Sequence, residues 1–472
     1  MDEWTNYWIR RWNGKFKRTL VRIEEIYFSA THTFMMEEIV IFWYRRDLRY
    51  NDNTALSKAL LSGKKVLPIF IFDTDILEML PDKDPRLQFI VHQLQQINQH
   101  FKTSFLSGVQ SYHGKPLEVF KSLIETSNNF KVCGVYTNED YEPYAIQRDL
   151  EIKTYLATKS VDFNAFKDQV IFEKDQVTKE DGKPYVVYTP YKNKWLSIFE
   201  QQYPQGFQAL EMPLENLYKI NTSLHDMKAL GYSEAEIKVP NYSVSTELIE
   251  EYEAKRNFPS IENGTSKLGP HLRFGTVSVR ALVQKAKAQK NQVFLSELIW
   301  REFFMQILWH FPHTPTKAFK PAYDRIEWRN NTAEFERWKN GTTGYPLVDA
   351  GMRELNATGT MHNRVRMLVA SFLCKHLLID WRWGEAYFAE KLLDFELASN
   401  VGNWQWAAGS GVDAAPYFRI FNPTTQIDKF DKQHIYLKKW VPDLGEITYP
   451  SPMVDHKIAR ERCLETYKKA LA

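Results

Sequence analysis

Short runs of β-branched and aromatic residues alternate with helical stretches along the first third of the chain. The apolar runs 38–44 (EIVIFWY), 65–73 (KVLPIFIFD) and 131–140 (KVCGVYTNED) each end in polar residues, and helical patterns at 54–62, 86–101 and 116–126 separate them. This alternation predicts an α/β domain with a doubly wound, Rossmann-like parallel sheet. No G-x-G-x-x-G motif follows the first run, so the usual dinucleotide-binding fingerprint is absent.

The second half of the chain shows a different pattern. From residue 248 it is helical nearly to the end and needs no strand, which predicts an all-α domain. Between the halves runs a long connector with turn signals at Asp181-Gly182 and at 204–206. Connectors this long usually wrap a scaffold or form a lid, and we expect this one to wrap the first domain and lead into the second. We therefore expect an α/β domain at 36–165, a connector at 166–240 and a helical domain at 241–472.

The first 35 residues follow no pattern found later in the chain. They are basic and aromatic, but they lack the continuous apolar stretch of a secretory signal, and their acidic residues argue against an organelle transit peptide. We expect an upstream extension, or a start codon assigned too early, with little structure of its own.

Composition sets the broad class of protein. The chain has 472 residues, of which 44% are hydrophobic and 25% charged, as in folded globular proteins. No apolar run reaches the ~18 residues of a membrane span. The three cysteines, Cys133, Cys374 and Cys463, are odd in number and far apart. They fit neither a disulfide framework nor a metal site, and they favour a reducing cytoplasm.

Local charge is more informative than the net charge of +3. From Arg301 to Arg382 the chain holds 12 Lys and Arg against 8 Asp and Glu, a surplus of four positive charges. Such a segment is typical either of a polyanion-binding surface or of a solvated face of mixed charge.

Residues 400–423 (NVGNWQWAAGSGVDAAPYFRIFNP) hold the densest candidate chemistry. Asn400 and Trp404 are four apart and share a helix face, whereas Trp406 lies roughly 200° around the helix from Trp404. One indole can therefore serve a buried partner while the other lines a separate surface. The small residues AAGSG indicate backbone that approaches a bulky group other than protein. The alternative is a tryptophan-rich core segment; the concentration of eight of the 14 Trp between 300 and 406 favours a site.

The run WQWAAGSGVDAAPYFRIFNPTTQ resembles the signature of the photolyase/cryptochrome flavoproteins, and most of all the bacterial class I photolyases that act on cyclobutane pyrimidine dimers. The likeness extends from about Ile39 to the C-terminus and includes WYRRDLRYNDNTAL, which is similar to the family's N-terminal signature FRRDLR. It implies a helical domain that holds FAD in a bent shape. It also implies a carbon–carbon lyase that repairs the dimers with light, by electron transfer from excited reduced FAD to a flipped-out dimer.

The resemblance implies which residues bind FAD. Thr265, Ser266 and Lys267 offer hydroxyls, backbone N–H groups and a cation ahead of a helix, as a diphosphate requires, although most such runs only cap helices. Many family members have Ser where this chain has Gly269, and Asp where it has Glu396. The implied set is Tyr252, Thr265, Ser266, Lys267, Leu268, Gly269, Asn363, Arg366, Asp394, Phe395, Glu396 and Asn400.

Catalysis and DNA binding are implied in the same way. Glu297, Trp300 and Arg301 share one helix face, which indicates a pocket more than an exposed salt-bridged surface because Trp300 is costly to leave in water. By resemblance Asn400 lies beside flavin N5, Glu297 binds the dimer, and Trp300 with Met367 completes the catalytic set. The implied DNA-binding residues are Arg256, Glu297, Trp300, Arg301, Asn363, Arg364, Trp406, Gln426 and Lys429.

Three indoles, Trp404, Trp381 and Trp328, match the family's electron-transfer tryptophans, which run from the flavin to the surface. Each indole is oxidisable, so an excited oxidised flavin can draw electrons along such a line. Packing in a core is the alternative role for all three.

The resemblance also implies a light-harvesting antenna at the strand ends of the first domain. Folate-binding members have an Asn-Glu pair where this chain reads Tyr144-Ala145, after Tyr141-Glu142-Pro143, so a flavin or deazaflavin is favoured over folate. The expected partner is UV-damaged DNA, double- or single-stranded and of any sequence, and the expected state is a monomer away from membranes. Two alternatives stay open: a cryptochrome-type photoreceptor, and a photolyase for (6-4) photoproducts, whose histidines replace Asn363 and Met367.

Overall fold

The computed structural model describes residues 36–127 and 129–472; the predicted extension at 1–35 lies outside this part of the chain. Five parallel strands form one sheet in the order β3-β2-β1-β4-β5. The strands are β1 (Glu37–Tyr44), β2 (Lys65–Phe72), β3 (Gln110–His113), β4 (Phe130–Asn138) and β5 (Asp162–Phe166). The helices around them are α2 (Thr54–Leu60), α3 (Thr74–Leu77), α4 (Pro85–Phe105), α5 (Pro116–Glu125) and α6 (Pro143–Thr158).

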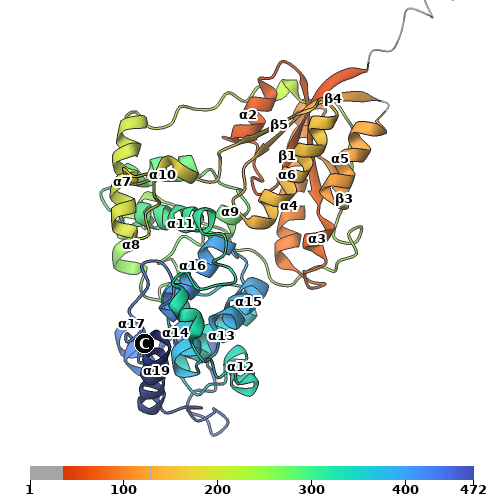
Figure 1. Cartoon of the computed structure of the whole chain (residues 1–472). Coiled ribbons are helices and arrows are strands. Elements are labelled where there is room, and N and C mark those ends of the chain that lie inside the picture. Colours follow the sequence, from red (N-terminus) through yellow and green to blue (C-terminus); the bar gives the residue numbers. More distant parts are fainter. Residues whose placement is uncertain (1–35, 128) are drawn as a thin grey trace, which may run out of the picture.

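Strand β1 explains why the sheet is doubly wound. Alternate side chains point to opposite faces, so Val40 and Phe42 pack with α2 and α4, whereas Ile41 and Trp43 pack with α5 and α6. Both faces are covered, as its continuous apolar sequence requires. The predicted parallel α/β domain is confirmed, and in Figure 1 it forms the upper right lobe, in red to yellow.

From α8 (Thr246–Lys255) onward the described chain contains helices and no strand, as predicted, whereas the connector before it is largely irregular. The 3-10 helices are η1 (Lys174–Gln176), η2 (Leu214–Asn216) and η3 (Pro321–Arg325), and η4 (Phe372–His376) is a π-helix. The α-helices are α7 (Tyr188–Gln202), α8 (Thr246–Lys255), α9 (Gly269–Arg273), α10 (Val279–Lys287), α11 (Val293–His310), α12 (Thr332–Lys339), α13 (Pro346–Thr358), α14 (Asn363–Ser371), α15 (Trp381–Lys391), α16 (Leu397–Ala408), α17 (Pro423–Phe430), α18 (Ile435–Trp440) and α19 (His456–Leu471).

The segment 166–240 divides its contacts between the two domains. Helix α7 packs beside α11 in the helical domain, where Tyr191 and Trp195 are buried (Figure 1). Further along, Leu217, Met227 and Leu230 are buried against the α/β domain, and Leu217 pairs with Val66 of β2. The segment therefore packs on both domains.

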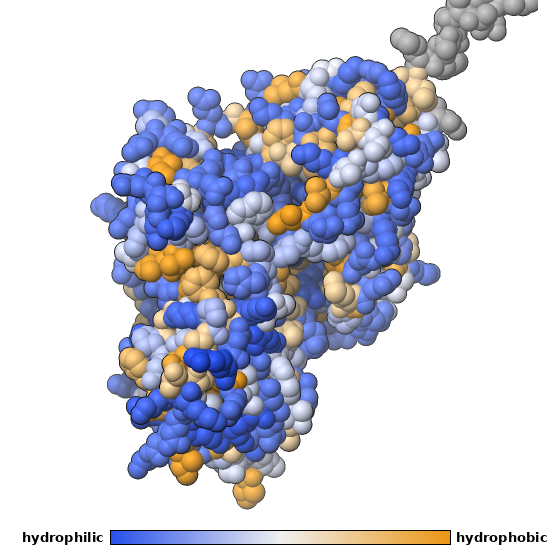
Figure 2. All heavy atoms as spheres, in the orientation of Figure 1, coloured by the Kyte–Doolittle hydropathy of each residue, from blue (hydrophilic) through white to orange (hydrophobic). Residues whose placement is uncertain are grey.

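The visible surface is mostly polar, with apolar residues scattered in small groups (Figure 2). Within 36–127 and 129–472, no helix is both long enough and apolar enough to cross a membrane.

Glu302 of α11 joins the connector to the helical core. It is 4% exposed, and its carboxylate accepts hydrogen bonds from the backbone N–H groups of Ile171 (2.6 Å) and Phe172 (3.0 Å) and from the Trp195 indole (2.6 Å). Both oxygens are engaged, so one buried side chain satisfies donors from two separate segments.

We predict that Glu302→Gln lowers the free energy of unfolding by about 1–3 kcal/mol, because the new amide N–H₂ faces a backbone N–H donor that it cannot satisfy. Denaturant unfolding measures this loss. The control is Glu118→Gln, which removes an exposed ion pair with Lys121 and should change stability little. Equal effects of the two substitutions would contradict the assigned role.

Candidate functional site

A cavity with about 590 Å³ of empty space opens in the helical domain between α14, α15 and α16. Many of the residues predicted to hold a flavin or to act beside it line this cavity. They are Asn363, Arg366, Met367, Asp394, Phe395, Glu396, Asn400, Trp404 and Trp406. These side chains come from the helices α14 and α16 and from the segment that joins α15 to α16.

One wall of the cavity is held by the ion pair between Arg366 and Asp394. The guanidinium donates to both carboxylate oxygens (3.1 and 2.9 Å), and its Nε donates to the carbonyl of Met361 (2.8 Å). Gly269 lies directly against this pair, because a Cβ there would come within 2.5 Å of Asp394 Oδ2. A serine at this position would therefore need Asp394 to move, which is a packing reason for the glycine.

The other predicted binding residues near Gly269 lie outside this lining. Lys267 is exposed and adopts the left-handed conformation (φ 54°), Thr265 and Ser266 are half-buried, and Leu268 is buried. Tyr252 of α8 packs edge-on against Phe294 of α11. Among the residues that the structure describes, the close approach of Gly269 to Asp394 thus links this group of predicted FAD-binding residues to the cavity lining.

Asn400 is oriented by Glu385, a residue that the sequence did not single out. The Asn400 amide nitrogen donates to the backbone carbonyl (3.1 Å) and the carboxyl Oε1 (2.9 Å) of Glu385. With both amide hydrogens engaged, the carbonyl Oδ1 is left as the polar atom available to a ligand. Burial raises the pKa of the Glu385 carboxyl, and the hydrogen bond from Asn400 opposes this rise.

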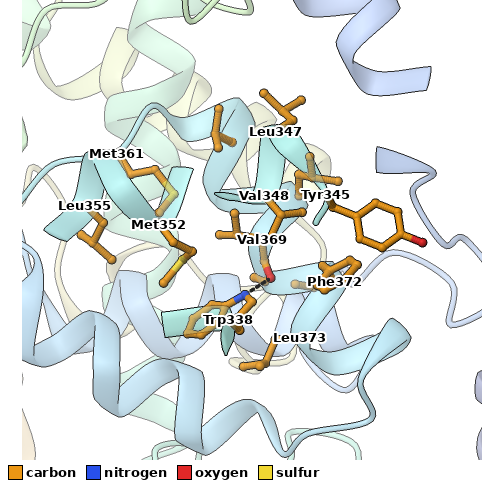
Figure 3. Close-up of a cluster of buried hydrophobic side chains, with 14 of the residues drawn as sticks. Trp338, Tyr345, Leu347, Val348, Met352, Leu355, Met361, Val369, Phe372 and Leu373 are labelled. Carbon is orange, nitrogen blue, oxygen red and sulfur yellow. Dashed lines mark hydrogen bonds between the residues drawn. The ribbon is translucent and has the colours of Figure 1, made fainter. Parts of the chain in front are cut away.

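The two indoles of α16 have different surroundings, as their spacing predicted. Trp404 is 2% exposed and packs edge-on against Phe388 (5.0 Å between ring centroids) and Trp338 (6.2 Å). Trp406 is half-buried. Figure 3 shows Trp338 inside the hydrophobic cluster, where its indole donates to the carbonyl of Val369 (3.1 Å). Its contact with Trp404 could not be read from sequence spacing.

The remaining predicted electron-transfer residues are Trp381, which is fully buried, and Trp328, which is half-buried. The guanidinium of Arg382 lies 4.8 Å from the Trp381 ring centroid, and Tyr467 packs edge-on against Trp328 at 6.1 Å. The exposure of the three indoles thus increases from Trp404 and Trp381 to Trp328.

Helix α11 carries the predicted substrate residues and packs along α16. Glu297 is ion-paired with Arg256, and one face of Trp300 is stacked on Tyr188 (3.6 Å, 10° between ring planes). Tyr188 therefore holds this indole in place by packing against one of its faces. Arg301 turns inward instead: its side chain is 12% exposed, and its guanidinium donates to Glu396 (3.1 Å) and to the carbonyl of Gln169 (2.7 Å). This placement does not suit the predicted contact of Arg301 with DNA.

Three arginines lie near enough for their charges to affect one another. They are Arg256 at the end of α8, Arg364 at the start of α14 and Arg419 before α17. Burial lowers the pKa of Arg364, and the positive charges of Arg256 and Arg419 lower it further. Arg364 also hydrogen-bonds to Asn257 and lies over the Phe430 ring (4.4 Å). Of the other predicted DNA-binding residues, Asn363 and Lys429 are exposed and Gln426 is half-buried. The cluster is suited to hold phosphate groups.

Comparison with known proteins identifies this architecture. Residues 40–211 match the DNA photolyase family, and residues 294–448 match the FAD binding domain of DNA photolyase. The chain is 35% identical to a deoxyribodipyrimidine photo-lyase of Escherichia coli, over 91% of this chain and 98% of that protein. The chain belongs to the DNA photolyase family.

Two solved structures resemble this photolyase over nearly their whole length. A class III photolyase from Agrobacterium tumefaciens superposes with a TM-score of 0.81 at 32% identity, covering 92% of this chain and 98% of that one. An archaeal photolyase from Sulfolobus tokodaii, described with two FAD molecules, gives a TM-score of 0.78 at 33% identity, covering 92% of this chain and all of that one. The family-level expectations of a DNA repair lyase with an FAD-binding helical domain are thus confirmed.

We predict that Glu385→Leu alters the redox behaviour of the bound FAD while FAD content stays near normal, because Asn400 loses the acceptors that fix its amide. Absorption spectra recorded during photoreduction measure this change. Glu390→Leu on the exposed side of α15 is the control and should match the parent. A Glu385→Leu spectrum identical to the parent's at every stage would contradict the orienting role.

Proposed function

We propose that the protein repairs cyclobutane pyrimidine dimers in DNA under blue light. When bound in the cavity, reduced FAD supplies the light-excited electron that opens the dimer's ring, and the chain's residues position both partners. The observation that supports this most directly is the packing of α11, which carries Glu297 and Trp300, along α16, which carries Asn400 and Trp406. Glu297 and Trp300, which are suited to a substrate, thus stand on one helix, and its neighbour carries Asn400, which is suited to the flavin, together with Trp406.

The dimer must leave the duplex to reach the cavity, and its weakened stacking and pairing lower the cost of flipping. We assign the free face of Trp300 and the half-buried Trp406 as the walls that receive it. Arg256, Arg364, Gln426 and Lys429 would hold the flanking phosphates, and such contacts carry no base sequence. Repair should therefore be independent of the sequence around the lesion.

Glu297 is assigned to the dimer and Asn400 to flavin N5. The carboxyl of Glu297 would bind the base edge of the dimer and stabilise the charge that the electron adds there. The Asn400 carbonyl oxygen is suited to accept a hydrogen bond from a protonated N5, because Glu385 engages the amide hydrogens. Met367, which lines the cavity, would contribute apolar contact.

A (6-4) photolyase is less well supported. His362 precedes Asn363, but its Nδ1 accepts from the backbone of Arg364 as the cap of α14. Burial, followed by the charges of Arg366 and Arg364, lowers the pKa of His362 to about 4, so this ring is neutral at pH 7. It is therefore unsuited to act there as a charged acid.

A second chromophore is proposed for a cleft of about 920 Å³ at the carboxyl ends of β4 and β5. Apolar side chains of α6 and β5 line it opposite Trp309 of α11, with Asp140 and Lys153 among its charged groups. Next to this cleft, the Tyr144 hydroxyl donates a hydrogen bond to Asp73 (2.5 Å), which directly follows β2, and so covers the strand ends there. The open part of the cleft therefore lies toward β5. We favour a flavin or deazaflavin here over folate; extraction of the bound pigments identifies it.

We predict that the reduced protein removes cyclobutane dimers from irradiated DNA under blue light and leaves (6-4) photoproducts in place. Lesion-specific antibodies measure both products, and a dark sample is the control. Loss of (6-4) products alone would favour the second photolyase class, and loss of neither would favour a photoreceptor.

We predict that Glu297→Ala lowers the repair yield per photon several-fold and leaves FAD content near normal, because the residue is assigned to the substrate. The quantum yield of repair at saturating light measures this effect. Glu251→Ala, which removes an exposed ion pair on α8, is the control. An unchanged yield in Glu297→Ala would refute the role.

We predict that Trp328→Phe slows photoreduction of oxidised FAD but spares repair by FAD that is already reduced, because phenylalanine keeps the packing and is much harder to oxidise. Trp406→Phe should do the reverse and weaken dimer binding while photoreduction persists. Photoreduction rate and dimer affinity are measured for both proteins side by side. If Trp328→Phe photoreduces as fast as the parent, another surface donor feeds the flavin.

A further inference from the structure

The guanidinium of Arg46, just after β1, joins the two domains. Its Nη1 donates to Asp140 Oδ1 (3.0 Å) and Glu142 Oε1 (2.9 Å), which follow β4, and its Nη2 donates to Glu396 Oε1 (2.9 Å), which immediately precedes α16. The Arg46 side chain is 11% exposed and that of Glu396 is 5% exposed. Buried charges of this kind are stable only when paired.

Two more arginines complete a network of balanced charge. Arg273 pairs with Glu142 (2.6 Å), and Arg301 pairs with Glu396 (3.1 Å). Three guanidiniums thus face three carboxylates. Burial opposes the ionisation of Glu396, but the positive charges of Arg301, Arg46 and Arg273 outweigh it and lower the pKa of this carboxyl.

Glu396 is the member of this network that lines the FAD cavity. Its Oε1 accepts from Arg46 and Arg301, and its Oε2 accepts from the Ser399 hydroxyl (2.9 Å). Both oxygens therefore have protein partners. Without Arg46, Glu396 would keep Arg301 as its one directly paired guanidinium, and Asp140 would lose the guanidinium that it contacts directly.

We propose that Arg46 is a positioning residue of the cofactor site. From the α/β domain it fixes the Glu396 carboxylate in the cavity wall and cancels its charge there, which allows an anionic cofactor to bind. FAD carries negative charge, and an uncancelled carboxylate in a partly buried wall would weaken its binding. The inference rests on FAD binding in this cavity.

The test separates the effect at the cavity from the effect on stability. Arg46→Met keeps much of the side-chain length and removes the charge. It is compared with two double variants, Arg46→Met/Glu396→Gln and Arg46→Met/Asp140→Asn, each of which removes one carboxylate. FAD dissociation constants come from fluorescence titration, and apo-protein stability comes from thermal unfolding. Glu396→Gln alone gives the upper limit of recovery, and Arg280→Met is the control because Arg280 also joins the two domains but pairs with Asp52 and Asp168, outside the network.

We expect Arg46→Met to weaken FAD binding at least tenfold and to lower the unfolding temperature of the apo protein. Glu396→Gln should restore the affinity of Arg46→Met, whereas Asp140→Asn should restore its unfolding temperature, because Asp140 is the carboxylate left without a cation in direct contact. An unchanged affinity in Arg46→Met, or an affinity restored by Asp140→Asn and not by Glu396→Gln, would overturn the positioning role. If the parent itself bound no FAD, the assigned cofactor site would fail, and the unfolding temperatures would still report on the ion pairs.

Discussion

Helix α16 is fixed at two places where a glycine of one helix lies directly against an aromatic ring of the next. A Cβ on Gly402 would lie 2.2 Å from the ring of Phe304 in α11, and a Cβ on Gly384 of α15 would lie 2.1 Å from the ring of Trp404. The helix is thus held between α11 and α15 at contacts that allow almost no rotation. Three residues of α16 share this rigid support: Asn400 in the cavity wall, the buried Trp404 and the outer Trp406. Their positions relative to one another therefore stay fixed.

Three buried or half-buried carboxylates of the polar interior follow one physical rule, because each is matched by partners from a distant segment. Glu302 is satisfied by the connector, Asp394 by Arg366 of α14, and Glu396 by Arg46 of the other domain. Such pairs add little net stability compared with apolar packing, but they are costly to break. Their effect is to select one arrangement of the segments around the cavity.

The sequence was most informative where local pattern and final structure agree. Strands β1, β2 and β4 were predicted because a strand buried on both faces reads as a continuous apolar run. The edge strands β3 (QSYH) and β5 (DFNAF) were not, because they are short and polar and their pairing depends on neighbours already in place. The cavity lining was largely anticipated from the resemblance. Glu385, Trp338 and Arg46 were not, because each acts through a contact with another element that no local spacing encodes.

The bond between Arg46 and Glu396 spans 350 positions of the chain, and this has a consequence for biosynthesis. A ribosome needs roughly 20–70 seconds to travel that far at typical rates of elongation. During this interval the first domain can fold on its own, but the Arg46 guanidinium, which later pairs with Glu396 of the cavity wall, has only Asp140 and Glu142 as acidic partners. The cavity wall that we assign to FAD is therefore completed only late in translation, when α16 emerges and docks.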